Sequence, residues 1–157
     1  MTLASLIEPF VGRTGGLISA LHEVQRVHGY LPEETEAEAA RVFNLTRAEV
    51  KGVISFYHDF KREPQGKTVV RLCAAEACQA AGGRDFIAAV EKKYALKMGE
   101  TSASKDLTLE PVYCLGLCST GPAAMVDGRL VGMADTGKIE KAVERAKVER
   151  AKKESVS

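Results

Sequence analysis

Apolar residues in the first third of the chain recur every three or four positions, which is the spacing of one face of an α-helix. The clearest stripe predicts a helix from Thr14 to His28. We expect that helix to end at Gly29, since glycine readily adopts the left-handed conformation that closes many helices. The stripe consists of Leu17, Ile18, Leu21, Val24 and Val27.

Two further helices follow in the same region. One is expected from Leu31-Pro32 to Phe43-Asn44, with Pro32 at the first helical position, where its missing N–H does no harm. Thr46 and Glu49 have the spacing of a capping box and predict the start of a third helix, which we expect to stop near Phe60. Residues 1–63 therefore form a predicted helical bundle that we expect to pack on something else.

The pattern changes after a predicted turn at residues 63–66. Alternating, β-rich stretches predict strands at 67–72 and 107–113, and a hairpin at 123–133 that turns at Asp127-Gly128. Pro111 belongs near an edge or at the end of its strand, because it lacks a ladder donor. Helices are expected at 84–94 and after Asp135 or Thr136, with a frayed basic end at 145–153.

This order of elements predicts an α/β fold for residues 64–157. The first two strands are joined by a helix, so we expect them to be parallel with a right-handed crossover. The sequence β-α-β, hairpin, α is the connectivity of a thioredoxin-like domain whose central helix is replaced by a loop. The chain thus divides into a helical bundle at 1–63 and a thioredoxin-like β-α-β-β-β-α domain at 64–157.

Composition removes several classes of function. The 157 residues are 45% apolar and 27% charged, as in ordinary globular proteins, and the net charge of +1 argues against nucleic acid as the main partner. No apolar run reaches the roughly 18 residues of a membrane span. The N-terminus lacks a basic region and carries Glu8 early, unlike a secretory signal, so we expect a cytoplasmic protein.

Four cysteines are the candidate chemistry of the chain. Cys73 and Cys78 form a C-x4-C pair, and Cys114 and Cys118 form a C-x3-C pair. Each pair follows a predicted strand, so we expect both in loops at the carboxyl ends of adjacent strands, where open α/β sheets place their sites. The residues between the cysteines are mostly small or apolar and would let backbone amides approach the sulfurs.

Four interpretations of these cysteines compete. A [2Fe-2S] cluster needs two thiolates on each iron, so Cys73 and Cys78 would share one iron and Cys114 and Cys118 the other. Structural zinc fits the C-x3-C pair, whereas C-x4-C is at the limit of zinc spacing. A dithiol oxidoreductase would use C-x-x-C, and inert buried cysteines would not fall in pairs at strand ends. The spacing favours the cluster but leaves the other three open.

Nothing else in the chain points to a reaction. The sequence contains no G-x-G-x-x-G, P-loop or H-E-x-x-H motif, so no catalytic residue is expected. His22, His28 and His58 lack spaced partners and are expected to pack or face solvent. Phe56-Tyr57 fits either the core or a surface buried against another protein.

The combined motifs resemble a known family, the thioredoxin-like [2Fe-2S] ferredoxins, and within it the 24 kDa subunit of respiratory complex I. The resemblance covers nearly the whole chain and implies a [2Fe-2S] cluster. The matching stretches are His28-Gly29-Tyr30-Leu31-Pro32, Val53-Ile54-Ser55-Phe56-Tyr57, Pro64-Gln65-Gly66-Lys67, the first cysteine pair, Gly99-Glu100-Thr101 and Tyr113-Cys114-Leu115-Gly116-Leu117-Cys118.

The stretch from Leu115 to Gly128 departs from complex I and looks more like the gamma subunit of soluble, molybdenum-containing NAD-dependent formate dehydrogenases. Bidirectional hydrogenases have a similar diaphorase subunit. The resemblance implies an electron-transfer subunit of an NAD-dependent oxidoreductase. Its partner would be a flavoprotein that holds FMN, binds NAD(H), carries a [4Fe-4S] cluster and leads to a larger catalytic subunit. The alternative of another class is a zinc-bound assembly module.

Overall fold

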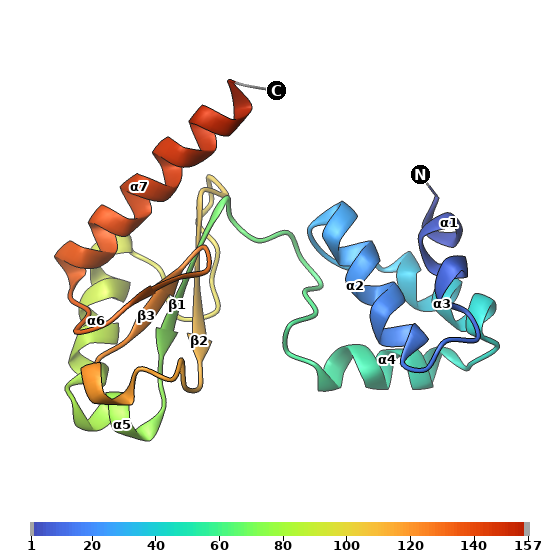
Figure 1. Ribbon diagram of the computed structural model, residues 1–157, viewed down its shortest axis with the longest axis horizontal. Coiled ribbons are helices and arrows are strands. Elements are labelled where there is room, and N and C mark those ends of the chain that lie inside the picture. The colour runs from blue at the N-terminus through green and yellow to red at the C-terminus, as the bar shows by residue number, and fades with distance from the viewer. Residues whose placement is uncertain (1, 156–157) are drawn as a thin grey trace. The chain divides into compact units, whose positions relative to one another are not determined.

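A computed structural model describes residues 2–155 of the chain (Figure 1). The chain divides into two compact units, Met1–Pro64 and Gln65–Ser157. The first is built only of helices within the described residues, and the second contains a sheet with helices. The predicted division into functional domains 1–63 and 64–157 stays a prediction. No helix among the described residues is both long and apolar enough to cross a membrane.

The first unit is a small helical bundle. Its core contains Leu21 and Val24 together with Leu31, Val50 and Ile54, all of them almost completely removed from solvent. Burial of one such side chain contributes about 1.5–3 kcal/mol relative to its exposure, so the core rather than helix propensity holds the bundle. The elements are α1 (Leu3–Ile7), η1 (Glu8–Phe10), α2 (Gly16–His28), α3 (Glu34–Phe43) and α4 (Arg47–Phe56).

Local capping signals in this unit act as their chemistry predicts. Gly29 closes α2 with φ +80°, and its N–H donates to the Gln25 carbonyl at 2.7 Å. At the start of α4, the Glu49 N–H donates to the Thr46 hydroxyl, and the Glu49 carboxylate accepts from the Thr46 N–H in return. This reciprocal contact lowers the pKa of Glu49, chiefly because the Thr46 N–H stabilises its charged form.

Two predicted helix boundaries in this unit differ from the structure. The α3 helix begins at Glu34, although the Thr35 N–H already donates to the Pro32 carbonyl in the preceding turn. The α4 helix ends at Phe56 rather than near Phe60, because Tyr57 is extended and Phe60 turns back into the core. The Phe60 ring there lies 4.8 Å from the His22 ring, a tertiary contact that no local pattern encodes.

The second unit is built on a four-stranded sheet in the order β2-β1-β3-β4. Strand β1 is parallel to β2 and antiparallel to β3, and β3 and β4 form the predicted hairpin at Asp127-Gly128. Pro111 lies on the edge strand β2, as predicted. The elements are β1 (Thr68–Cys73), α5 (Glu76–Ala80), α6 (Gly83–Tyr94), β2 (Leu107–Val112), η2 (Cys118–Thr120), β3 (Ala124–Val126), β4 (Arg129–Val131) and α7 (Thr136–Glu154).

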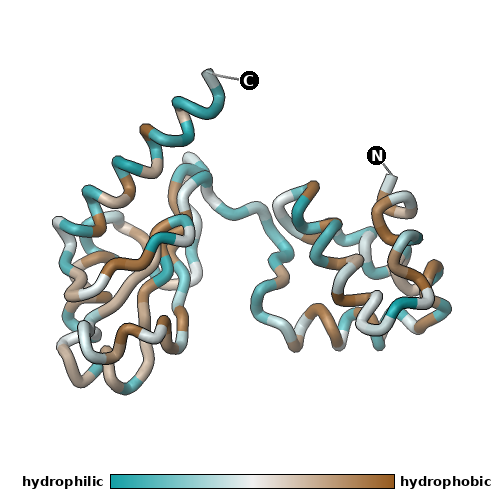
Figure 2. The backbone as a smooth tube through the Cα atoms, viewed as in Figure 1, coloured by the Kyte–Doolittle hydropathy of each residue, from teal (hydrophilic) through white to brown (hydrophobic). Residues whose placement is uncertain are grey.

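Helices α6 and α7 cover one face of this sheet (Figure 1). Val70 and Leu72 of β1 and Leu109 of β2 pack there against side chains such as Val90 and Ile139. The Asp135 carboxylate caps α7 by accepting from the Lys138 N–H at 2.8 Å, as predicted. Residues 145–153 remain helical rather than frayed, and the hydropathy drawing shows that this part of α7 is largely hydrophilic (Figure 2).

The strand order and connections are those of the predicted thioredoxin-like α/β fold. Residues 113–123 stand where that fold would have a central helix, and they contain no regular element except the short η2. This replacement leaves an irregular segment at the carboxyl end of β2. That end of the sheet carries all four cysteines.

Candidate metal centre

Cys73 and Cys78 are held by regular structure at the carboxyl end of β1. Cys73 is the last residue of the strand, and Cys78 lies in the short helix α5. Both are 2% exposed. The prediction that this pair lies in a loop was therefore wrong, and the reason is local: Glu76-Ala77-Cys78-Gln79-Ala80 is rich in strong helix formers.

Cys114 and Cys118 lie on the irregular segment after β2 and are exposed. Their sulfurs are 3.7 Å apart, and the Gly116 N–H donates to the Cys114 sulfur at 3.4 Å. Cys114 has φ +81°, a left-handed conformation that is costly for a residue with a side chain. This pair follows a strand in a loop, as predicted, except that Cys118 opens the 3₁₀ turn η2.

The parallel register brings the two cysteine segments to one end of the sheet. Cys73 pairs with Val112, so β1 and β2 end side by side. The Cys73 N–H donates to the Ala123 carbonyl at 3.0 Å, which ties β1 to the end of the second segment. Around the sulfurs of Cys73 and Cys78 lies a small apolar cluster made of Ala75, Val112, Leu115, Leu117 and Ala123.

Backbone N–H groups and neighbouring sulfurs set the acidity of these thiols. Burial raises the pKa of the Cys73 thiol, but the N–H groups of Ala75, Cys114 and Leu115, with the Cys78 thiol, bring it below its usual value. Burial, and then the Cys73 sulfur, raise the pKa of Cys78. The Cys114 sulfur raises the pKa of Cys118. The other cysteine of the same pair therefore contributes to the pKa shift of each of these three thiols.

Two glycines allow close packing around Cys78. A methyl group on Gly83 would lie 2.5 Å from the Cys78 carbonyl oxygen, so α6 begins directly against α5. A methyl group on Gly121 would lie 3.6 Å from the Cys78 sulfur and 3.1 Å from the Ala81 methyl. The segment that carries Cys114 and Cys118 therefore packs closely on α5 at Gly121, where a larger side chain would not fit without a shift.

The donor set is four thiols arranged as two pairs. Within 2–155, no three His, Cys, Asp or Glu side chains converge closely enough to hold one metal ion. The Cys114 and Cys118 sulfurs are 3.7 Å apart, and the Cys73 thiol acts on the pKa of Cys78. Two thiolates on each of two irons is the ligand set of a [2Fe-2S] cluster, so these residues fit that group.

A comparison with protein families decides the family. Residues 3–147 match the family model described as "Thioredoxin-like [2Fe-2S] ferredoxin". The chain belongs to this family. The resemblance drawn from the sequence is confirmed at that level, and a thioredoxin-like [2Fe-2S] ferredoxin has a [2Fe-2S] cluster as its cofactor.

This ferredoxin is similar to components of two kinds of enzyme complex. It is 33% identical over 121 residues to a component of the NADH-quinone oxidoreductase of Aquifex aeolicus, covering 77% of this chain and 76% of that one. It is 29% identical to the HndA component of the NADP-reducing hydrogenase of Solidesulfovibrio fructosivorans, covering 88% of this chain and 81% of the relative. Both relatives are named as subunits of NAD(P)-linked oxidoreductases.

A solved structure shows the same fold. The ferredoxin superposes on a chain of an NAD+-reducing [NiFe]-hydrogenase in the H2-reduced state with a TM-score of 0.68 and 26% identity. The match covers 85% of this chain and only 22% of the hydrogenase chain. The activity of that larger protein is therefore not evidence for an activity of this one.

Sequence reasoning missed some features around the site. Tyr113, next to Cys114, is 74% exposed. The ion pair between Arg71 and Glu110 was missed as well. Aligning the two predicted parallel strands would have placed these two residues side by side. His22 packs on Phe60 in the first unit.

Proposed function

We propose that this chain is an electron-transfer subunit in which Cys73, Cys78, Cys114 and Cys118 hold a [2Fe-2S] cluster. The observation that carries the proposal is the pairing of four thiols at the carboxyl ends of β1 and β2. Cys73 and Cys78 would hold one iron, and Cys114 and Cys118 the other. The bound group supplies reversible uptake of a single electron.

Other groups around the site would tune the reduction potential and the access of water to the sulfurs. N–H groups that reach the Cys73 and Cys114 sulfurs stabilise negative charge there. Leu115 and Leu117 keep water from the inner sulfurs. The exposed position of Cys114 and Cys118 leaves one side of the site open to a redox partner.

The partner that fits is a flavoprotein that holds FMN, binds NAD(H) and carries a [4Fe-4S] cluster. A flavin takes two electrons from NADH as hydride, whereas this chain's cofactor moves one, so the two carriers are complementary. Support comes from the relatives, which are named as subunits of NADH-quinone oxidoreductase and of an NADP-reducing hydrogenase. Phe56 and Tyr57, which are exposed aromatics, suit burial against this partner or another subunit.

For the parent complex we propose a soluble, cytoplasmic NAD-dependent formate dehydrogenase, with a larger catalytic subunit beyond the flavoprotein. The support is the sequence of residues 115–128, from Leu115-Gly116-Leu117-Cys118 through Pro122 to Asp127-Gly128. The alternatives are the diaphorase subunit of an NAD-linked hydrogenase and the corresponding subunit of complex I, which the names of the relatives favour.

Anaerobic purification of the tagged chain tests the cofactor. The proposal requires red-brown protein with about two irons and two sulfides per chain and an EPR signal on reduction. Colourless protein with one zinc per chain would instead support the assembly-module interpretation. The same preparation from its native cells should contain a flavoprotein, which a free-standing electron shuttle would not retain.

The co-purified complex also tests the parent enzyme. Formate-dependent reduction of NAD+ would support the formate dehydrogenase proposal. Hydrogen-dependent reduction of NAD+, or NADH oxidation coupled only to quinone, would contradict it and support the respective alternative. Mass spectrometry of the bands identifies the large catalytic subunit in each case.

A further inference from the structure

The sheet face that α6 and α7 leave uncovered carries a charged pair near Cys73. Side chains alternate between the faces of a strand, so Arg71 and Cys73 of β1 share this face. Arg71 is in register with Glu110 on one side and with Met125 on the other. Residues two apart on a strand are separated by about 6.6 Å, so this pair is the next layer below the cysteine site.

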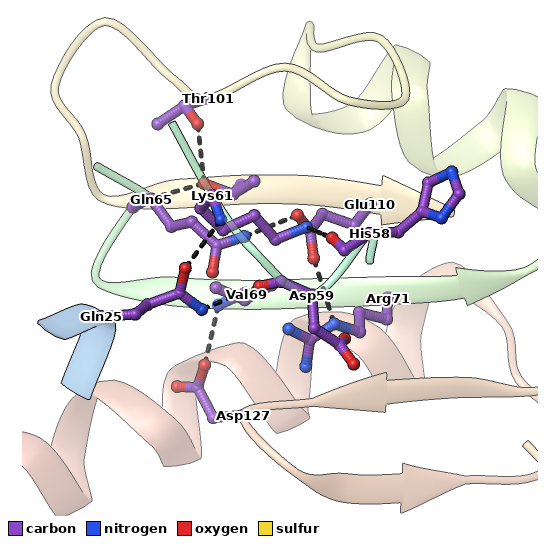
Figure 3. A network of polar contacts seen from close by, with 12 residues as sticks. Gln25, His58, Asp59, Lys61, Gln65, Val69, Arg71, Thr101, Glu110 and Asp127 are labelled. Carbon is purple, nitrogen blue, oxygen red and sulfur yellow. Dashed lines mark hydrogen bonds and ion pairs between the residues drawn. The ribbon is translucent and has the colours of Figure 1, made fainter. Parts of the chain in front are cut away.

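The pair is held by hydrogen bonds and is partly buried. The Arg71 Nε donates to Glu110 Oε2 at 3.1 Å, and the Gln65 amide donates to Glu110 Oε1 at 2.6 Å (Figure 3). The side chains of Arg71 and Glu110 are 30% and 12% exposed. Water therefore screens these two charges less than it screens an ordinary surface pair.

We propose that Arg71 and Glu110 act as an electrostatic pair that sets the reduction potential of the cluster at Cys73. The inference rests on the proposed function. Reduction adds one negative charge to the site. Arg71 favours the reduced state, and Glu110 opposes it, so the intact pair holds the potential at an intermediate value.

Removal of either charge then has a predictable sign. In Glu110→Gln the Arg71 charge is uncompensated, and the reduced state is favoured. In Arg71→Gln one positive charge near the site is lost, and the oxidised state is favoured. A unit charge about 10 Å away, at an effective dielectric constant of about 20, changes such an equilibrium on the order of tenfold.

The experiment is a potentiometric titration of the purified full chain, followed by EPR and visible absorption. At fixed potential, the ratio of reduced to oxidised protein should rise about tenfold in Glu110→Gln and fall about tenfold in Arg71→Gln, each equal to about 59 mV for one electron. The double variant should return close to the wild-type value. Arg71→Lys keeps the charge and should shift little, even if it weakens the fold.

The matched control is Arg150→Gln. Arg150 pairs with Asp127 at 3.0 Å, with side chains 28% and 31% exposed. Asp127 bonds the Val69 N–H, so this pair lies about 13 Å along β1 from Cys73. The Coulomb energy falls with distance, so the control should shift the potential less than Arg71→Gln does while it removes a comparable ion pair.

Each outcome separates the inference from the proposed function. Opposite shifts in the two single variants, both larger than the shift in the control, support the role of the pair. Cluster-loaded variants with unchanged potentials, or with shifts of the same sign, would overturn it and leave the electron-transfer proposal standing. Wild-type protein without iron and sulfide would overturn both.

Discussion

The two cysteine pairs have the same chemistry but opposite environments. Cys73 and Cys78 are buried, and a strand and a helix hold them in place. Cys114 and Cys118 are exposed, on a segment with little regular structure. The inner pair is set by the fold of the sheet, whereas the outer pair depends on a loop conformation that is costly at Cys114.

This difference separates two tasks of a redox site. The inner half can be shielded from water, because its backbone is already satisfied by the β1 ladder and by α5. In the proposed function, the outer half would approach a partner for electron transfer, which agrees with the exposure of Cys114 and Cys118. We expect changes at the inner pair to affect both the fold and the cofactor, and changes at the outer pair to affect the cofactor alone.

The largest expected effect comes from removing one thiol of either pair. Both Cys78→Ala and Cys114→Ala should lose the cluster, with iron falling from about two per chain to near zero. In the cluster-free form, Cys78→Ala should also lower the free energy of unfolding by about 1 kcal/mol, because it leaves a small cavity. Cys114→Ala should change it by less than about 0.5 kcal/mol.

Iron analysis and urea denaturation under reducing conditions measure these effects. Ser119→Ala, next to Cys118, is the control and should keep its iron. Equal destabilisation by the two cysteine variants would contradict the difference in environment. Iron retained at wild-type level in either one would contradict its role as a ligand.

Alkylation of the cluster-free protein is the second test. Cys114 and Cys118 should react with iodoacetamide roughly a hundredfold faster than Cys73 and Cys78, whose reaction requires local opening. The pKa of Cys73 is lowered and that of Cys118 is raised, so thiolate content alone predicts that Cys73 reacts faster than Cys118. Peptide mapping by mass spectrometry decides, and Cys73 reacting first would show that acidity outweighs access.

The smallest expected effects on the cluster come from glycines, which act mainly on stability. Gly83→Ala places a methyl group against the Cys78 backbone and should cost about 1–3 kcal/mol, with some loss of cluster. Gly116→Ala meets open space but has φ +75°, so it should cost about 1–2 kcal/mol. Thermal unfolding measures both.

Gly52→Ala in α4 is the control for these two glycine variants. It meets no atom within 4 Å and should stabilise by about 0.5–1 kcal/mol. A neutral Gly83→Ala variant would show that α5 can move away from α6. The inner pair would then be less firmly held than its burial indicates.

Features with a local cause could be predicted from the sequence. Gly29, the Thr46–Glu49 capping box and the Asp127-Gly128 turn each act through residues a few positions apart, and the structure confirms all three. The parallel pairing of β1 with β2 also followed from simple connection rules. The cysteine spacing indicated two pairs, although the role of each as a ligand remains a proposal.

Features with a tertiary cause could not be predicted. Helix α5 is too short to show periodicity, so its cysteine looked like a loop residue. The end of α4 depends on Phe60 packing against His22, far away in the sequence. The unequal exposure of the cysteine pairs depends on how residues 113–123 fold over β1, which requires the assembled sheet.

The join between the two compact units is short. Arg62 forms an ion pair with Glu36 of the first unit, and Gln65 bonds Glu110 of the second, so Glu63 and Pro64 are the residues between these anchors. A protease cut at this point would separate the two units without dividing either hydrophobic core. The second unit, which carries all four cysteines, thus has the physical character of a separable folding unit.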